Sequence, residues 1–159
     1  MTISATMQRY LQDRGVPHEV LTHPVTGSST ETAQSAHVSG DRIAKTVVLR
    51  VGDAADGYLL AVLPASHHLS LELLQGWLGK SVVLASEQEI GKLFPDCELG
   101  AIPPLGEAYG LDAVLDDSLA GLDEVCFEGG DHRSLIKIGG DRFRQLMSGA
   151  RQGRFSTHD

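Results

Sequence analysis

The sequence predicts a mixed α/β fold, in which helices surround a largely antiparallel sheet. Segments rich in β-branched residues recur along the chain, and the clearest of them spans 45–51. A short polar turn separates this segment from a second strand candidate at 58–63, so the two are predicted to form a hairpin. Amphipathic stretches lie between other strands, but tight turns between neighbouring strands disfavour a regular βαβ alternation.

The composition is that of one globular domain. The chain has 159 residues, of which 42% are hydrophobic and 21% charged, which is enough for a real core. No apolar run reaches the ~18 residues needed to cross a bilayer, and the N-terminus has no signal-peptide pattern. Two cysteines, Cys97 and Cys126, do not make a disulfide framework and favour the cytoplasm. We expect a single domain over residues 1–150 and a loose tail over 151–159.

Capping and breaking residues set the limits of the predicted elements. Ser28 with Glu31, and Ser86 with Glu89, have the spacing of a capping box, and Asp141 is placed to cap a last helix. The predicted helices cover 3–14, 28–38, 69–78, 86–94 and 141–147, with a helical turn at 41–44. The predicted strands cover 18–21, 45–51, 58–63, 81–85, 110–115, 124–127 and 134–138.

An uncharged loop, Gly100 to Gly106, follows an acidic segment. Pro103 and Pro104 fix φ and remove two N–H donors, so the loop is neither helix interior nor central strand. Glycine at each end permits positive φ and close backbone approach. Such a stiff loop suits one wall of a pocket, where backbone N–H groups point at a ligand. A rigid surface turn is the alternative.

The charge is unevenly divided along the chain. A net charge of −8 disfavours strong non-specific binding to nucleic acid. No lysine or arginine occurs between Lys92 and Arg133, whereas the segment from Arg133 to Arg154 is basic. This basic end is either a local contact for a polyanion or a set of charges spread over solvated faces.

Common catalytic signatures are absent from the sequence. It has no G-x-S-x-G elbow, no phosphate loop and no glycine pattern for dinucleotides. It has no zinc spacing either, and the adjacent His67 and His68 point to opposite sides of an extended segment, which makes a poor metal pair. We therefore predict neither a metal nor a cofactor.

Polar residues near the predicted strand ends remain as candidates. Lys45 begins an apolar strand at the rim of the sheet, where it either projects into a cleft or lays its stem on apolar surface. His23 precedes Pro24, a hydroxyl-rich loop leads to Thr30, and His132 follows a Gly-Gly-Asp turn. Each of these signals is weak when taken alone.

Together, these segments resemble the family of YbaK and prolyl-tRNA synthetase-associated domains, which are aminoacyl-tRNA editing deacylases. Order and spacing agree from about residue 5 to residue 148. The matching segments are His23-Pro24, Thr30-Glu31-Thr32-Ala33, Ala44-Lys45-Thr46-Val47-Val48, Gly100-Ala101-Ile102-Pro103-Pro104 and Gly129-Gly130-Asp131-His132. The resemblance implies a mixed α/β domain with a curved, mostly antiparallel sheet.

The resemblance also implies a reaction, which is hydrolysis of the ester between a wrongly attached amino acid and the 3′-terminal adenosine of a tRNA. In that family a water molecule attacks, helped by a free ribose hydroxyl, without a metal or a protein nucleophile. Lys45 matches the family's lysine and is expected to anchor the substrate. The N–H groups of Gly100 and Ala101 are expected to stabilise the developing oxyanion.

Further positions are expected to contact the substrate by the same resemblance. They are His23, Thr30, Thr46, Ile102, Pro103, Pro104 and His132. In the alanine-editing branch an asparagine follows the lysine and a histidine lies in the later glycine-rich turn. His132 fits the second position, but Thr46 departs from the first, so alanine, cysteine, serine and threonine all remain open.

The implied partners are aminoacylated tRNA and, beyond it, an aminoacyl-tRNA synthetase, with no membrane involved. Two other functions remain open on the sequence alone. A non-catalytic module of the same fold would bind tRNA or a small ligand, which the negative net charge favours. A hydrolase for another small ester or amide would use the same pocket.

Overall fold

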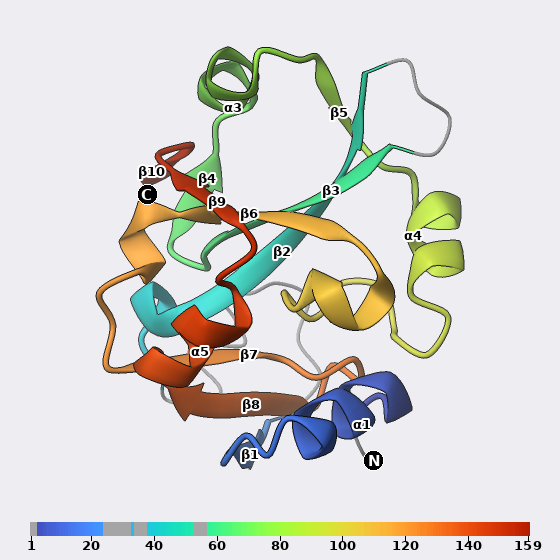
Figure 1. Cartoon of the computed structure of the whole chain (residues 1–159), viewed down its shortest axis with the longest axis vertical. Helices are drawn as coiled ribbons and strands as arrows, with labels where there is room; N and C mark the ends of the chain where they lie inside the picture. The colour runs from blue at the N-terminus through green and yellow to red at the C-terminus, as the bar shows by residue number, and fades with distance from the viewer. Residues whose placement is uncertain (1–2, 24–32, 34–37, 53–56) are drawn as a thin grey trace.

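A mixed sheet of eight strands forms the centre of the computed structural model, which describes residues 3–23, 33, 38–52 and 57–159 (Figure 1). Its strands are β1 (Glu19–Thr22), β2 (Ile43–Val51), β3 (Tyr58–Pro64), β5 (Val82–Leu84), β6 (Asp112–Asp116), β7 (Glu124–Glu128), β8 (Ser134–Gly139) and β9 (Arg151–Gly153). They are ordered β1-β8-β7-β2-β3-β6-β9, and β5 also pairs with β2. A second, two-stranded sheet joins β4 (His67–Leu69) to β10 (Ser156–His158).

The sheet is mixed and mostly antiparallel, as the sequence predicts. The hairpin of β2 and β3 is antiparallel, as are the pairs β1–β8, β2–β5 and β7–β8. The pairs β2–β7, β3–β6 and β6–β9 are parallel. Strand β2 therefore has three partners, and it lies in the middle of the fold.

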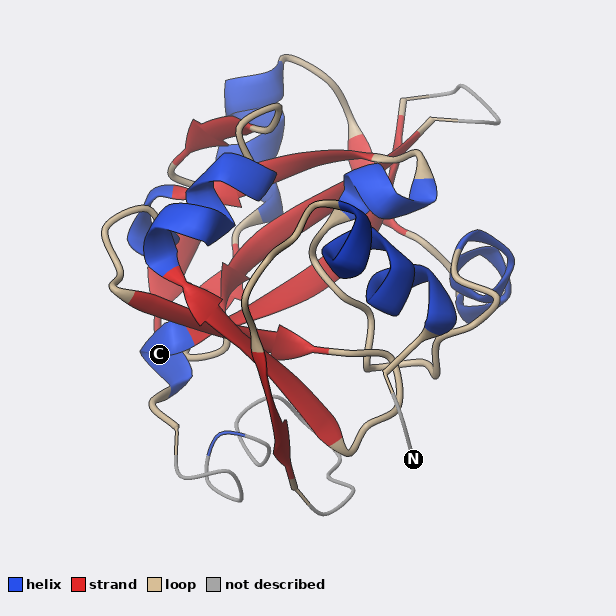
Figure 2. Ribbon diagram, turned by 60° about the horizontal axis from the view of Figure 1, so that its bottom comes forward, coloured by secondary structure: helices blue, strands red, loops and turns tan. Residues whose placement is uncertain are grey.

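Helices lie around the sheet (Figure 2). Those in the described residues are α1 (Ala5–Asp13), α3 (Leu71–Leu78), α4 (Glu87–Leu93) and α5 (Gly140–Leu146), with 3-10 turns η1 (Gly40–Arg42), η2 (Gly106–Tyr109) and η3 (Asp117–Leu119). The capping box of Ser86 and Glu89 is confirmed at the start of α4. None of the described helices is long and apolar enough to cross a membrane.

Strand β3 separates two parts of the hydrophobic core, because side chains alternate between the faces of a strand. Val62 faces a cluster formed with α1, α5, β7 and β8, whose members include Leu11, Phe127 and Phe143. Leu63 faces a second cluster, in which α3 and β5 contribute. Both faces of β3 are thus buried, which accounts for its continuous apolar sequence.

The starts of two elements differ from the prediction. Strand β2 begins at Ile43, so Lys45 is its third residue rather than its first. Gly139 is the N-cap of α5 and makes no side-chain capping bond, whereas the Asp141 carboxylate accepts a hydrogen bond from Arg144. The chain enters α5 directly from β8, which leaves no turn that would place Asp141 at the cap.

The tail after Gly149 also differs from the expected loose segment. It contributes β9 to the main sheet and β10 to the small sheet. Between them Phe155 is fully buried, stacks on Trp77 with ring centroids 6.1 Å apart, and donates its N–H to Asp116 Oδ1 at 3.0 Å. One aromatic side chain thereby fixes the segment to the core, because burying a ring gains more than the chain loses in freedom.

Candidate active site

A pocket of about 400 Å³ brings together segments that are far apart in the sequence. Of the residues predicted to act on a substrate, Lys45 and Thr46 line it from β2, and Gly100 and Ile102 line it from the uncharged loop Gly100–Gly106, called the proline loop below. The rest of its wall includes Leu84 at the end of β5, Ala85 after it, Ile90 on α4 and Glu128 at the end of β7. Four predicted residues thus share one cavity.

The proline loop reaches this pocket because its apolar residues are buried in the fold. Ile102 packs with Val48 of β2 and Phe94 in one hydrophobic cluster. Pro103 and Pro104 are buried as well, and neither lines the pocket. The two prolines are therefore buried parts of the loop itself, and we assign them to stiffening it.

The side chain of Lys45 is half-buried and hydrogen-bonded to the backbone. Its Nζ donates to the carbonyl oxygen of His67 at 2.5 Å and to that of Ala65 at 3.5 Å. Burial lowers the pKa of Lys45 below its ordinary value, and the charge of Asp159 opposes this shift. The two carbonyl groups hold the ammonium beside the pocket before any substrate arrives.

Gly100 occupies a position that only glycine fits. Its φ is +84°, and a Cβ there would lie 2.8 Å from Cε1 of His132. His132 itself has a positive φ of 61°, and its Nε2 forms a hydrogen bond with the carbonyl oxygen of Leu99. His132 does not line the pocket, so we assign it to supporting the Gly100 segment from behind.

The backbone at Ala101 argues against the role expected for it. Ala101 is fully buried, and its N–H donates to the carbonyl oxygen of Glu98 at 3.1 Å. That donor is therefore occupied by the turn itself and does not face a substrate. Across the described residues, the N–H groups of Gly100 and Ile102 have no hydrogen-bond acceptor, and both residues line the pocket, so the N–H of Gly100 stays a candidate oxyanion donor.

Glu128 is a pocket residue that the sequence did not single out. Glu128 is the last residue of β7. The parallel register pairs Phe127 with Ala44, and Glu128 and Lys45 are the next residues on the two strands. Behind Glu128 lies His23, whose side chain is fully buried and whose Nε2 is 3.7 Å from Glu128 Oε1. The sequence feature that could have indicated Glu128 is a carboxylate directly before the Gly129-Gly130 turn. Its place beside Lys45 depends on parallel pairing of β2 with β7, which local sequence patterns do not predict.

The remaining predicted positions divide into two groups. Thr46 lines the pocket, and its buried Oγ1 has no hydrogen-bond partner in the described part of the chain. Its environment agrees with a contact to a polar ligand atom, because buried hydroxyl groups are normally paired. Thr30, and the helix predicted over 28–38 apart from Ala33 and Val38, lie outside the described residues.

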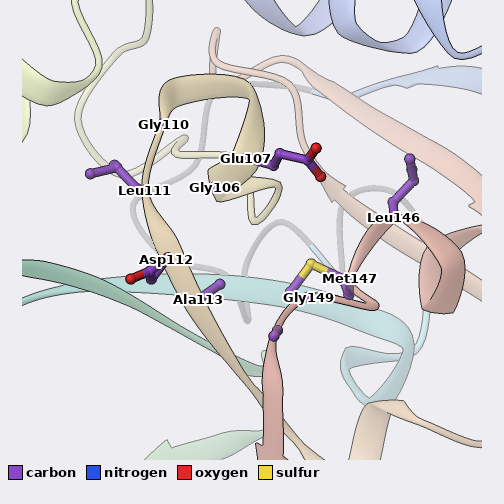
Figure 3. A pocket seen from close by; sticks show the side chains of 10 residues that line it. Gly106, Glu107, Gly110, Leu111, Asp112, Ala113, Leu146, Met147 and Gly149 are labelled. Carbon is purple, nitrogen blue, oxygen red and sulfur yellow. The ribbon is translucent and has the colours of Figure 1, made fainter.

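A second pocket, of about 260 Å³, contains none of the predicted residues. Figure 3 shows it between the η2–β6 segment, with Glu107 and Asp112, and the end of α5, with Leu146 and Met147. Its ionisable lining groups are the two carboxylates, which repel a polyanion. Of these two pockets, the one beside Lys45 is therefore the better candidate for a nucleic-acid substrate.

Comparison with known proteins agrees with the sequence resemblance. The model of the aminoacyl-tRNA editing domain matches residues 23–146. A candidate trans-editing enzyme for prolyl-tRNA synthetase has a TM-score of 0.81 and 25% identity, with 98% of this chain and 99% of that chain covered. A scaffold protein from computational grafting of linear epitopes has a TM-score of 0.83 and 24% identity, with 97% of each chain covered.

The same fold also occurs within a longer protein. A candidate signal transduction protein from Marinobacter aquaeolei has a TM-score of 0.78 and 20% identity, and the match covers 98% of this chain but 31% of that one. No curated protein matches the chain. The editing-domain match spans both Lys45 and Gly100 and most of the sequence. The chain belongs to the aminoacyl-tRNA editing domain family.

Proposed function

We propose that the chain is a deacylase that acts in trans on mischarged tRNA and hydrolyses the ester of a small, wrongly attached amino acid. The observation that carries this proposal is the meeting of Lys45, Gly100 and Glu128 at one pocket. Family membership supports an editing function, and the similarity to a candidate trans-editing enzyme supports action in trans. The setting would be the cytoplasm, where tRNA is charged.

The charges of the pocket suit an aminoacyl ester. Lys45 and Glu128 are the ionisable groups among its described lining residues. An aminoacylated tRNA end carries an ammonium on its amino acid and phosphates next to its ribose. We assign the ammonium to Glu128 and a phosphate, ribose or carbonyl oxygen to Lys45, since opposite charges attract strongly where water is partly excluded.

The proposed reaction needs little from the protein, because an aminoacyl ester is already reactive. A water molecule attacks the carbonyl carbon, helped by the free ribose hydroxyl, and the ester oxygen leaves on the ribose. The N–H of Gly100 stabilises the oxyanion, and loss of one such donor costs roughly 100- to 1,000-fold in other enzymes. Buried Pro103 and Pro104 keep the loop in place, which limits reorganisation.

We propose that the amino acid removed from the tRNA is alanine, cysteine, serine or threonine. Ile90, Leu84 and Val48 give the pocket apolar walls, and Thr46 adds a hydroxyl. One methylene changes binding in such a pocket by only about 1–3 kcal/mol, so exclusion of larger side chains would provide most of the selectivity. An aminoacyl-tRNA synthetase that makes the error is the second partner we propose.

Deacylation of a panel of mischarged tRNAs tests the proposal. tRNAs carrying alanine, cysteine, serine, threonine or proline are incubated with wild type, Lys45→Ala and the control Lys92→Ala, which changes an exposed lysine on α4. We expect wild type and the control to hydrolyse one or two of them, and Lys45→Ala to be folded but roughly 100- to 1,000-fold slower. Binding of tRNA without hydrolysis would instead indicate a non-catalytic module. Hydrolysis of minimal aminoacyl esters alone would indicate a different hydrolase.

The role of Glu128 has its own test. If its carboxylate holds the substrate ammonium, wild type should hydrolyse free aminoacyl-tRNA faster than N-acetylated aminoacyl-tRNA, which lacks that charge. Glu128→Gln should reduce this preference, while Glu124→Gln, on the same strand but outside the pocket, should keep it. An unchanged preference in Glu128→Gln would remove Glu128 from the substrate site.

A further inference from the structure

A cluster of three potential metal ligands lies where the small sheet meets η1. His67 on β4 and His158 on β10 are directly paired across the antiparallel strands, and Asp41 of η1 lies next to them. One ligand atom from each residue can be chosen so that all three lie within 4.8 Å of one another. Within the described ranges, it is the one group of at least three such side chains that could hold a metal ion.

The other ring nitrogen of each histidine is already engaged. His158 Nδ1 lies 2.9 Å from the carbonyl oxygen of Asp159, and His67 Nδ1 lies 2.8 Å from Ser156 Oγ. A histidine that ligates a metal usually donates its second N–H to an oxygen in this way, which fixes the tautomer and orients the ring. Both rings are therefore set to offer Nε2 as a ligand.

The carboxylate is held in the same manner. Ser66 Oγ donates to Asp41 Oδ1, and His158 Nε2 lies 3.2 Å from that oxygen. Ligand atoms of a four-coordinate zinc ion, at about 2.0–2.2 Å from the metal, lie roughly 3.4 Å apart. The Asp41–His158 pair thus already has the spacing of two zinc ligands, and His67 completes a set of two imidazoles and one carboxylate.

The neighbouring His68 shows why this cluster could not be predicted from the sequence. Its Nε2 forms an ion pair with Asp159 Oδ1 at 2.9 Å, on the other side of the strand from His67. The prediction that His67 and His68 make a poor metal pair therefore agrees with the geometry. The second imidazole comes instead from β10, in the segment that was expected to be loose.

We propose that Asp41, His67 and His158 bind a divalent transition metal ion, with zinc, cobalt and nickel as suitable ions. Imidazole and carboxylate ligands suit these metals, and water would fill the remaining positions because Asp41 and His158 have 59% and 60% of their side chains exposed. The ion would join η1, β4 and β10. It would also fix His67, whose carbonyl oxygen accepts the hydrogen bond of Lys45.

Metal titration of the full chain, first stripped with a chelator, tests this proposal. Zinc binding is measured by calorimetry, and cobalt binding by its visible absorption, which reports ligand number and type. We expect one ion per chain and a higher melting temperature with zinc. Asp41→Asn and His158→Gln should each weaken binding by more than the roughly 10- to 100-fold that is typical for changes outside the ligand set.

Two further variants separate a built site from scattered surface histidines. His68→Gln, next to His67 but outside the cluster, should bind the metal as wild type does. Ser156→Ala removes only the partner of His67 Nδ1 and should weaken binding by about 10- to 100-fold. The proposal is overturned if wild type binds no stoichiometric ion, or if Asp41→Asn and His158→Gln, both folded by circular dichroism, bind zinc as tightly as His68→Gln.

Discussion

Two of the pockets in the described part of the chain, the one beside Lys45 and the one beside Glu107, differ in chemistry more than in size. One holds a lysine, a glutamate and a glycine loop with positive φ, and the other is lined by two carboxylates, glycines and apolar side chains. Figure 3 shows that Glu107 and Asp112 supply the charged groups of the second pocket. The difference teaches that charge and backbone geometry, rather than volume, distinguish the pocket that we propose for the tRNA end.

The largest expected effect separates the two pockets by activity. Lys45→Ala should lower the deacylation rate roughly 100- to 1,000-fold, because it removes the cation that we propose contacts the substrate. Asp112→Ala, in the second pocket, should change the rate less than about twofold. Rates are measured in single turnover with saturating enzyme. Equal losses in both variants would mean that the two pockets cannot be distinguished by function.

The next effect compares one glycine from each pocket. Gly100→Ala should destabilise the fold by about 1–2 kcal/mol, because the φ of +84° strains an L-residue, and the new Cβ meets His132. It should also lower activity. Gly149→Ala, which lines the second pocket and has open space around its Cβ, should change neither property by as much. Urea unfolding and deacylation assays measure both properties, and a harmless Gly100→Ala would contradict the strained loop.

A smaller effect concerns the basic end of the chain. The guanidinium group of Arg144 already forms hydrogen bonds within the protein, because it donates to the carbonyl oxygens of Ala120 and Leu122. Arg133 is exposed, and it follows His132 in the turn that supports Gly100. Arg133→Glu should weaken tRNA binding and reduce the salt slope by about one or more, whereas Arg142→Glu on α5 should do so less. Filter binding at several salt concentrations gives both slopes.

The smallest effect is on acid stability at the wall of the candidate active site. A backbone hydrogen bond from Ser86 and a side-chain bond from Tyr58 lower the pKa of Glu89, at the start of α4, to about 2 from its ordinary 4.5. Because the pKa is lowered on folding, the stabilisation is complete above pH 4.5 and is lost as the pH falls towards 2. Glu89→Gln should flatten this dependence in acid unfolding curves. A curve identical to wild type would exclude Glu89 as its source.

Local patterns predicted most elements of the fold, and four of the residues expected at a substrate line the candidate pocket. The capping box at Ser86, the hairpin of β2 and β3 and the glycine of the proline loop follow from neighbouring residues, and all are present. Parallel pairing was beyond local pattern, because β2 meets β7 across a long stretch of chain. The pocket residue Glu128 was missed for that reason. The anchoring of the tail was missed because the burial of Phe155 also depends on residues far away in the sequence.

The role of a loop residue at the candidate site could be predicted only where its backbone N–H does not already form a hydrogen bond within the protein. Ala101 matches the family's loop, but its N–H donates a hydrogen bond to the carbonyl oxygen of Glu98. A sequence does not show such a bond. Pro103 and Pro104 were expected at the substrate, but they are buried and do not line the pocket. Sequence resemblance therefore locates a segment, while hydrogen bonding decides which of its atoms are available.

The three-partner strand β2 also bears on how the protein folds. Its hairpin with β3 is local and can form early, but its contact with β7 joins Ile43 to Cys126 and must wait for a large loop to close. The pocket, which needs both β2 and the end of β7, is thus assembled late. During refolding, recovery of deacylase activity should lag behind recovery of secondary structure, which makes activity a sensitive report of complete folding.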